Sequence, residues 1–137
     1  MLPNEQVIEL CKQAHVGLLP TFADTYGYAT LEMQACGLPV VTTDVRALTE
    51  INNETCGWVV HLTKNQYGEA CYSTDVSRNN MKHELQCGLE TTFKEIFENK
   101  EMIEVKAQES LVRLELNHSE SAYSEKMEVI YRNAIDG

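Results

Sequence analysis

Residues 16–41 of the chain read VGLLPTFADTYGYATLEMQACGLPVV, and the rest of the sequence is interpreted outward from them. Val16-Gly17-Leu18-Leu19 is an apolar run of strand length that stops at Pro20. Further on, Gly37 is a helix-ending residue, and Pro39 precedes a second extended run at Val40-Val41. The segment therefore predicts a buried strand, a turn, a short helix and a second buried strand.

The predicted turn and helix carry two acidic residues. Asp24 lies in the turn and Glu32 lies inside the helix, eight positions later. Between them, Gly27 allows backbone N–H groups at the start of the helix to come close to a ligand. Such an arrangement is typical of a site for an anionic molecule that carries several hydroxyl groups.

This segment resembles the donor-binding segment of family 4 (group 1) glycosyltransferases with the GT-B fold. The family pattern has an acidic residue, an aromatic-glycine pair and a second glutamate eight positions after the first, and Asp24, Tyr26-Gly27 and Glu32 fit this spacing. Residues 31–41, LEMQACGLPVV, stand where the family usually has "LEAMA-GxPVV". Aspartate stands at position 24, where the family usually has glutamate.

The resemblance implies a role for each matching residue. Asp24 would be the catalytic acidic residue and would contact hydroxyls of the transferred sugar. Glu32 would accept hydrogen bonds from the ribose of the donor. Backbone around Tyr26, Gly27 and Tyr28 would bind the diphosphate, to which the positive end of a helix is suited. Considered singly, Glu32 is an ordinary exposed helix residue and Asp24 a turn former; only the joint spacing favours a site.

The resemblance also implies an activity. The family transfers a sugar (as a hexosyltransferase, in polysaccharide biosynthesis) with retention, from a nucleotide-diphosphate sugar to an acceptor such as a growing glycan or a lipid. It requires no metal and no other cofactor. Arg46 and Ala47 stand where the family usually has two glycines, and Arg46 is interpreted either as a phosphate-binding charge or, by preference, as a surface arginine. Glu50 is interpreted as structural.

The remaining sequence predicts an α/β domain. An amphipathic helix is expected from Asn4, as N-cap, to Ala14, followed by strands over 15–19, 40–43 and 57–62. Residues 63–80 are expected to form a loop. Strands separated by helices indicate parallel βαβ units. The expected fold is therefore a partial doubly wound, Rossmann-like parallel sheet of about three strands followed by C-terminal helices, in a single domain over residues 1–137.

The C-terminal part predicts helices, with Ser119 as an N-cap. Three apolar stripes are interpreted as core, and their members are Leu85, Leu89, Phe93 and Ile96; Ile103, Ala107, Leu111 and Leu114; and Tyr123, Met127, Ile130 and Ala134. By the resemblance, the last helix crosses back to the other lobe of the enzyme. His83 and Cys87 are spaced i, i+4 on a helix, but two ligands without a third make only a weak metal site.

The composition of the chain excludes some kinds of binding partner and bears on its location. The formal net charge of −10 argues against nucleic acid or an anionic membrane as a partner. No apolar run approaches the roughly 20 residues that cross a bilayer, and no signal peptide is recognised. Five cysteines without a CxxC pair favour reduced thiols in a cytoplasmic protein.

The resemblance covers the second part of a donor-binding C-terminal lobe, without the N-terminal acceptor lobe. We therefore expect the chain to be part of an enzyme and inactive alone. A non-catalytic interaction module with the same fold remains an alternative, as does an unrelated α/β domain in which Asp24 and Glu32 are incidental. Because the strand over 15–19 is apolar and lacks its expected neighbour, a homodimer through this edge is also expected. The alternative is a monomer in which the helix from Asn4 to Ala14 folds over the edge.

Overall fold

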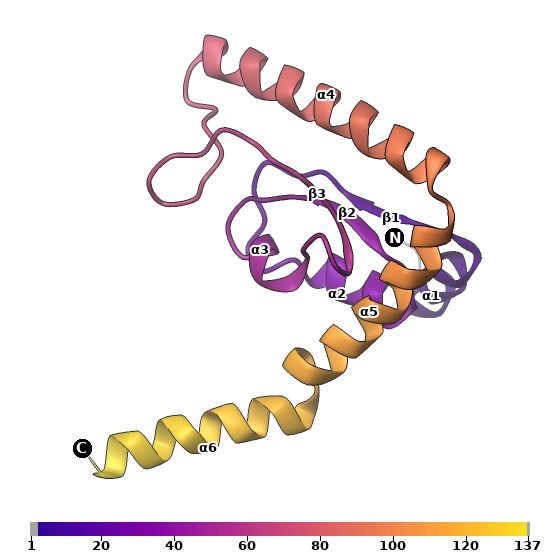
Figure 1. Ribbon diagram of the computed structural model, residues 1–137. Helices are drawn as coiled ribbons and strands as arrows, with labels where there is room; N and C mark the ends of the chain where they lie inside the picture. Colours follow the sequence, from indigo (N-terminus) through magenta and orange to yellow (C-terminus); the bar gives the residue numbers. More distant parts are fainter. Residues whose placement is uncertain (1–2, 137) are drawn as a thin grey trace.

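The computed structural model describes residues 3–136 and shows an α/β architecture (Figure 1). In chain order the elements are α1 (Asn4–Gln13), β1 (Gly17–Leu19), α2 (Tyr28–Ala35), β2 (Val40–Thr43), α3 (Leu48–Ile51), β3 (Gly57–Val60), α4 (Asp75–Glu98), α5 (Glu101–His118) and α6 (Glu120–Asp136). None of the helices within residues 3–136 is both long and apolar enough to span a bilayer.

The sheet has three parallel strands in the order β1-β2-β3, with β2 in the centre. Val40 of β2 lies opposite Gly17 on one side and Gly57 on the other. Each strand is followed by a helix or a crossover, as parallel pairing requires. The predicted fold class, a partial Rossmann-like parallel sheet of three strands followed by C-terminal helices, is confirmed.

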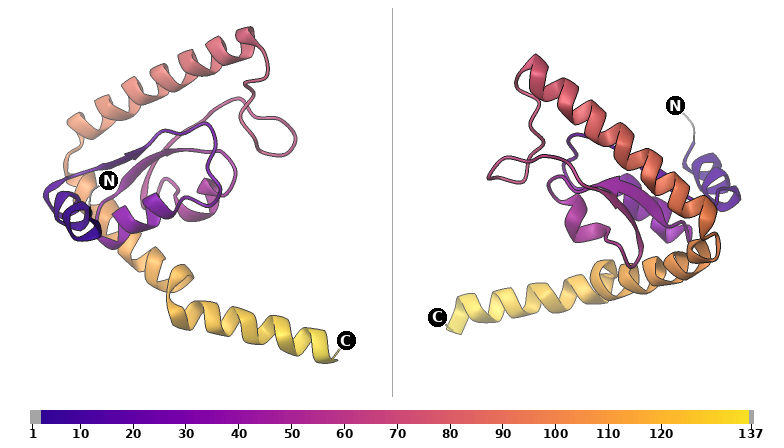
Figure 2. Two further views of the ribbon diagram at one scale, coloured as in Figure 1. Left: turned by 180° about the vertical axis from the view of Figure 1, so that it is seen from behind. Right: turned by 45° about the horizontal axis from the view of Figure 1, so that its top comes forward.

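The helices cover the sheet unequally. In Figures 1 and 2, α2 and α3 lie on one side of the sheet, whereas α4 crosses the other side. Helix α5 runs past one end of the strands, and α6 extends away from the sheet (Figure 1). The buried core is built mainly by β2, β3 and the segments that follow them, with Val41, Trp58, Val60, Met81 and Ile96 among its members.

Asn52, directly after α3, connects the sheet to the helix α2 and is 1% exposed. Its Nδ2 donates to the carbonyl of Val40 at 2.9 Å, to Oγ1 of Thr42 at 3.0 Å and to the carbonyl of Trp58 at 3.2 Å. Its Oδ1 accepts from Nε2 of Gln34 at 3.4 Å. One buried amide therefore connects α2, β2 and β3.

Trp58 of β3 lies where α4 and α5 meet the sheet. Its Nε1 donates to Oε1 of Glu95 on α4 at 3.0 Å. The Nζ of Lys106 on α5 lies 5.0 Å from the ring centroid and donates to the carbonyl of Gly57 at 2.8 Å. Lys106 is only 4% exposed, so these carbonyl and ring contacts take the place of the water that its side chain lacks.

Several predicted boundaries need correction. Pro3, not Asn4, is the N-cap of α1, and no side chain among the described residues caps that helix. β1 begins at Gly17 instead of residue 15, and β3 ends at Val60 instead of residue 62. The loop after β3 ends at Thr74, well before residue 80, because Thr74 and Ser77 form a capping box that starts α4 at Asp75. The prediction of a second strand over residues 40–43 is confirmed.

The apolar stripes differ in their burial. Ile96 and Ala107 are buried and the rest of the α4 stripe is half-buried, but Leu111 is 36% exposed. The interpretation of the α6 stripe as core is wrong, since Tyr123, Met127 and Ile130 are 43%, 43% and 57% exposed. Helix α6 packs mainly against α5, and Tyr123 also contacts Tyr26 in the loop before α2. The N-cap at Ser119 is confirmed, because its Oγ accepts the N–H of Ala122 at 3.2 Å.

Candidate functional site

The loop between β1 and α2 is folded by Asp24. Oδ1 of this half-buried side chain accepts the N–H of Tyr26 at 3.0 Å, which closes a tight turn just before the helix. The other end of the loop is fixed by Thr43 at the end of β2, whose Oγ1 donates to the carbonyl of Thr21 at 2.6 Å. The loop therefore lies at the carboxyl end of the sheet, where parallel α/β proteins bind ligands.

Gly27 is the N-cap of α2 and has a φ of 91°, in the left-handed region. A Cβ atom at this position would lie 2.7 Å from Cδ2 of Leu48 and 3.0 Å from Cδ1 of Ile51. Both the backbone conformation and the packing of α3 thus require glycine here. Its carbonyl accepts the N–H groups of Thr30 at 2.9 Å and Leu31 at 3.3 Å, which begins the helix.

The N-terminus of α2 has no side-chain cap in the part of the chain that is described. The first two residues of the helix, Tyr28 and Ala29, are exposed to solvent. An uncapped helix start carries unsatisfied donors and roughly half a positive charge, so it favours an anion. Asp24 borders this end of the helix, with Oδ1 3.9 Å from the position of a Cβ on Gly27.

Tyr26 and Tyr28 belong to an aromatic cluster that the sequence did not reveal. Their ring centroids are 5.2 Å apart, and the hydroxyl of Tyr26 lies 2.9 Å from that of Tyr123 on α6. The Tyr123 hydroxyl also lies 3.1 Å from Nδ1 of His118. The hydrogen bond with Tyr123, together with burial, raises the pKa of Tyr26 to about 12, so this hydroxyl stays protonated.

The surroundings of His118, at the end of α5, favour the neutral form of its imidazole. Burial, and then the positive charges of Lys126 and Arg113, lower the pKa of its imidazole. Its Nε2 is buried and makes no hydrogen bond within residues 3–136. Sequence reasoning missed His118 and Tyr123 as neighbours of Tyr26 because 97 positions separate the two tyrosines, and no local pattern reports such a contact.

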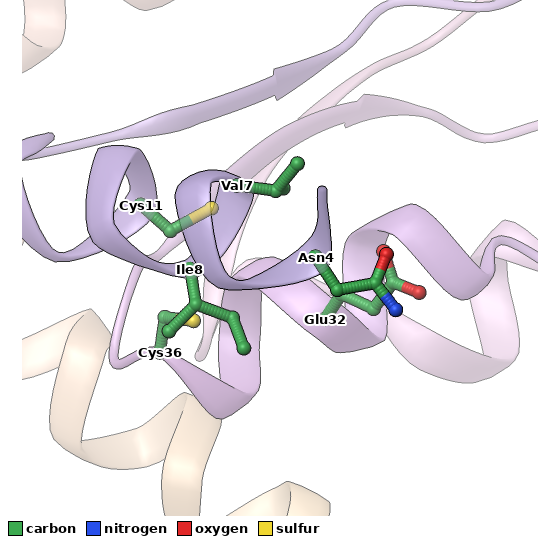
Figure 3. Close-up of a pocket in the computed structure, with 6 residues that line it drawn as sticks. All are labelled: Asn4, Val7, Ile8, Cys11, Glu32 and Cys36. Atoms are coloured by element: carbon green, nitrogen blue, oxygen red, sulfur yellow. The ribbon is translucent and has the colours of Figure 1, made fainter. Parts of the chain in front are cut away.

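Glu32 lies on the exposed face of α2, one turn after Tyr28. It lines a small hollow of about 130 Å³ between α1 and α2, together with Asn4, Val7, Ile8, Cys11 and Cys36 (Figure 3). Asp24 is not among the residues that line this hollow. The structure thus brings Asp24, Tyr26 and Gly27 together in one turn and places Glu32 farther along the same helix, beside α1.

A second polar group at the carboxyl end of the sheet was not predicted. Asp44, directly after β2, is 7% exposed and accepts hydrogen bonds from Nδ1 of His61 at 2.9 Å, from Nζ of Lys64 and from the N–H of Leu62 at 3.0 Å. Burial acts to raise the pKa of this carboxyl, but the bonds from Lys64, His61 and Leu62 outweigh it and lower the pKa below its usual value. The available signal was an acidic residue at the end of a buried strand.

The comparison with protein families decides what this arrangement belongs to. The model of the family described as "Glycosyl transferases group 1" matches residues 2–73, slightly more than half of the chain. The chain is a member of the group 1 glycosyltransferases. The matched residues run from α1 through β3 and include the whole loop at Asp24 and helix α2.

One curated relative of this glycosyltransferase chain is D-inositol 3-phosphate glycosyltransferase of Acidothermus cellulolyticus. The two are 38% identical over 48 residues, which is 35% of the present chain and 11% of the relative. The chain therefore spans only a small part of the length of this glycosyltransferase.

Arg46 is unusual for a group 1 glycosyltransferase, because the family resemblance places a glycine at this position. Its φ is 50°, the one positive φ outside glycine within residues 3–136. The strained backbone is held by the Arg46 N–H, which donates to the carbonyl of Gly68 at 3.1 Å, and by an ion pair with Glu69 at 2.8 Å. The side chain is thus directed to the loop after β3 as a surface arginine.

The two possible metal ligands considered in the sequence, His83 and Cys87, both lie on α4 of the glycosyltransferase chain. His83 and Cys87 are in contact on α4, with the thiol 3.7 Å from Nε2. Within residues 3–136, no three metal-binding side chains of the histidine, cysteine or carboxylate type meet.

Proposed function

We propose that residues 1–137 form one domain of the donor-binding lobe of a GT-B glycosyltransferase and bind a nucleotide-diphosphate sugar. The complete enzyme would transfer the sugar, with retention, to an acceptor such as a growing glycan or a lipid. Membership of the group 1 glycosyltransferases supports the reaction class. A cytoplasmic location is part of this proposal, in keeping with five cysteines that are all free.

The observation that carries the proposal is the turn at Asp24, Tyr26 and Gly27, which leads directly into the uncapped start of α2. Its backbone donors suit the diphosphate, because anions bind well at the positive end of a helix. Gly27 and Tyr28 take part in this proposal through their backbone N–H groups, whereas Tyr26, whose N–H is donated to Asp24, takes part by closing the turn. The hydroxyl of Tyr26 is already engaged with Tyr123.

In the proposal Asp24 is the catalytic acidic residue and binds the transferred sugar. Only Oδ1 takes part in the turn, by accepting the N–H of Tyr26. Oδ2 remains for hydroxyls of the sugar, so that one carboxylate both shapes the loop and binds the donor. A charge-assisted hydrogen bond of this kind contributes about 1.5–3 kcal/mol.

Glu32 is proposed to accept hydrogen bonds from the ribose hydroxyls. Its carboxylate is exposed, and it lies on the same face of α2 as Tyr28. A nucleotide whose diphosphate sits at the start of α2 would extend along this exposed face toward Glu32 and α1. The hollow in Figure 3 is then the end of the donor site that receives the nucleoside.

Titration of the isotope-labelled chain with a nucleoside diphosphate, followed by NMR, tests the proposal. We expect weak binding with a Kd of about 1 mM, and shifts that cluster at residues 24–32. Glu32→Gln should weaken binding about tenfold, since a charge-assisted bond to a hydroxyl becomes a neutral one. Glu90→Gln, at an exposed glutamate of α4, is the matched control and should leave binding unchanged. Shifts confined to residues 63–80, or none at high nucleotide concentration, would reject the assignment.

We further propose that this chain alone transfers no sugar. Catalysis of group transfer depends on holding both reactants in the right geometry, and the residues assigned here bind only the donor. The purified chain is incubated with a radiolabelled nucleotide sugar, and with and without a glycan acceptor. Detectable transfer, or detectable donor hydrolysis that depends on Asp24, would overturn this part of the proposal.

A non-catalytic interaction module is the second candidate. The exposed apolar face of α6 favours it, since Tyr123, Met127, Ile130 and Ile135 are 43–82% exposed although their helix packs on α5. Large exposed apolar patches mark contact surfaces. Nucleotide binding at residues 24–32 separates the two candidates, because an interaction module would have no need of it.

A further inference from the structure

Two cysteines from different helices face the hollow shown in Figure 3. Cys11 belongs to α1, Cys36 follows the last turn of α2, and both side chains line the hollow beside Glu32. Both are free thiols of intermediate exposure. They are therefore accessible to small molecules and positioned to interact with each other.

The surroundings of Cys36 support direct contact between the two thiols. Burial raises the pKa of the Cys36 thiol, and the next two causes are the charge of Cys11 and a hydrogen bond with its side chain. The nearby charge of Lys12 acts in the opposite direction. Both thiols line one hollow of about 130 Å³, so they are near enough to each other for a disulfide to form with adjustments of the two helices.

Helix α1 is the element that such a bond would restrain. It has no buried residue, and Val7, Ile8 and Leu10 on its apolar side are 36%, 43% and 55% exposed. A helix that buries so little apolar surface opens easily from the rest of the molecule. A covalent bond to α2 therefore has a large effect on its freedom.

We propose that Cys11 and Cys36 are a modification site, at which oxidation forms a reversible disulfide that fastens α1 to α2. The oxidant is a small-molecule disulfide, RSSR. The thiolate of one cysteine attacks RSSR and releases RS⁻, and the thiolate of the other attacks the mixed disulfide and releases a second RS⁻. The two cysteines lose their two protons and two electrons, and RSSR is reduced to two molecules of RSH.

The position of this pair links oxidation to the donor site, a consequence that rests on the proposed function. Asn4 and Val7 of α1 line the same hollow as Glu32. A disulfide holds these side chains against Glu32 and narrows the space for a ribose. Oxidation is therefore expected to weaken nucleoside diphosphate binding, and reduction to restore it.

The disulfide itself is tested on the full chain with Cys71→Ser and Cys87→Ser, which removes the two remaining accessible thiols and leaves the buried Cys56. After treatment with oxidised glutathione, intact mass spectrometry should show a loss of about 2 Da, and peptide mapping should join Cys11 to Cys36. Amide hydrogen exchange in residues 7–12 should slow about tenfold and recover after addition of a thiol reductant.

Two matched variants make the outcome decisive. Cys11→Ser and Cys36→Ser, in the same background, should each abolish the mass loss and the slower exchange. Glutathione adducts or intermolecular dimers at these cysteines, in place of the internal bond, would overturn the proposal. If the bond forms but neither redox state binds a nucleoside diphosphate, the proposed function fails and the redox site stands.

Discussion

At the level of single residues, a few buried polar side chains connect the elements of this small α/β domain. Asn52 is the clearest case, since its amide binds two backbone carbonyls and the hydroxyl of Thr42. Gly57 must be glycine beside it, because a Cβ there would lie 2.3 Å from Oδ1 of Asn52. The contact between β2, β3 and α2 thus depends on the side-chain amide of Asn52 and on the absence of a Cβ at Gly57.

Asn52→Ala should lower the free energy of unfolding by about 2–4 kcal/mol, because it leaves buried carbonyls unsatisfied and opens a cavity. Urea denaturation followed by circular dichroism measures the loss. Asn79→Ala, at an exposed position of α4, is the control and should change the value by less than about 0.5 kcal/mol. Equal stability of the two variants would show that the hydrogen bonds of Asn52 make no net contribution to the free energy of unfolding.

Asp44 should make stability depend on pH in the acid range. Its folded-state pKa is below the usual value, so its contribution is fully present above the unfolded pKa and is lost as pH falls through the folded pKa. Asp44→Asn removes this titration. The difference in unfolding free energy between the two proteins should shrink from about pH 7 to about pH 3. A difference that stays constant over this range would contradict the assigned ion pairs with Lys64 and His61.

At the level of elements, the sequence predicted the position of β2 but not the start of α4. β2 was predicted at its observed position, because Pro39 starts a run of β-branched residues at Val40. The capping box at Thr74 was overlooked, since Ser77 takes the place at which glutamate or glutamine is usual.

The start of α4 gives a direct test of that cap. Oγ1 of Thr74 accepts the N–H of Ser77 at 3.1 Å, and Oγ of Ser77 accepts the N–H of Thr74 at 3.0 Å. Thr74→Ala should therefore lower the free energy of unfolding by about 1 kcal/mol. Ser73→Ala, at the exposed neighbouring position, should be nearly neutral when measured by the same thermal or chemical melt. If both variants behave alike, the box does not stabilise α4.

The sequence revealed the apolar face of α6 but not that this face is exposed. Periodicity reports which side of a helix is apolar, whereas burial depends on whether another element lies against that side. The same limit applies to the site. The spacing of Asp24, Gly27 and Glu32 led to the family, but the position of α1 beside Glu32 depends on packing that no local pattern encodes.

At the level of the whole molecule, the sheet has an open side. Among residues 3–136, β1 pairs only with β2, and Leu18 in its centre is 48% exposed. Next to this edge lies an apolar groove of about 390 Å³, formed by residues before β1 and residues of α4 and α5, among them Val16, Phe93 and Ile103. An unprotected strand edge beside apolar surface tends to pair with another chain.

We therefore predict a homodimer in which the β1 edges of two copies cover each other. Sedimentation at micromolar concentration should show the dimer, and Leu18→Lys should convert it to a monomer by placing a charge on the edge. Leu116→Lys is the matched control, since this leucine of α5 is 69% exposed and lies away from β1. A soluble monomer of the unmodified chain, with slow hydrogen exchange along β1, would rule out the dimer.

The environment of Trp58 has a practical consequence for all of these measurements. It is the single tryptophan of the sequence, 1% exposed, bonded to Glu95 and covered by Lys106. Its fluorescence should be blue-shifted in the folded chain and should move to longer wavelength when α4 or α5 leaves β3. A nucleotide bound at the start of α2 would leave the emission of Trp58 unchanged. It would change the emission of the nearby tyrosines, Tyr26 and Tyr28, instead. The chain therefore contains one optical reporter for its core and a separate one for its proposed donor site.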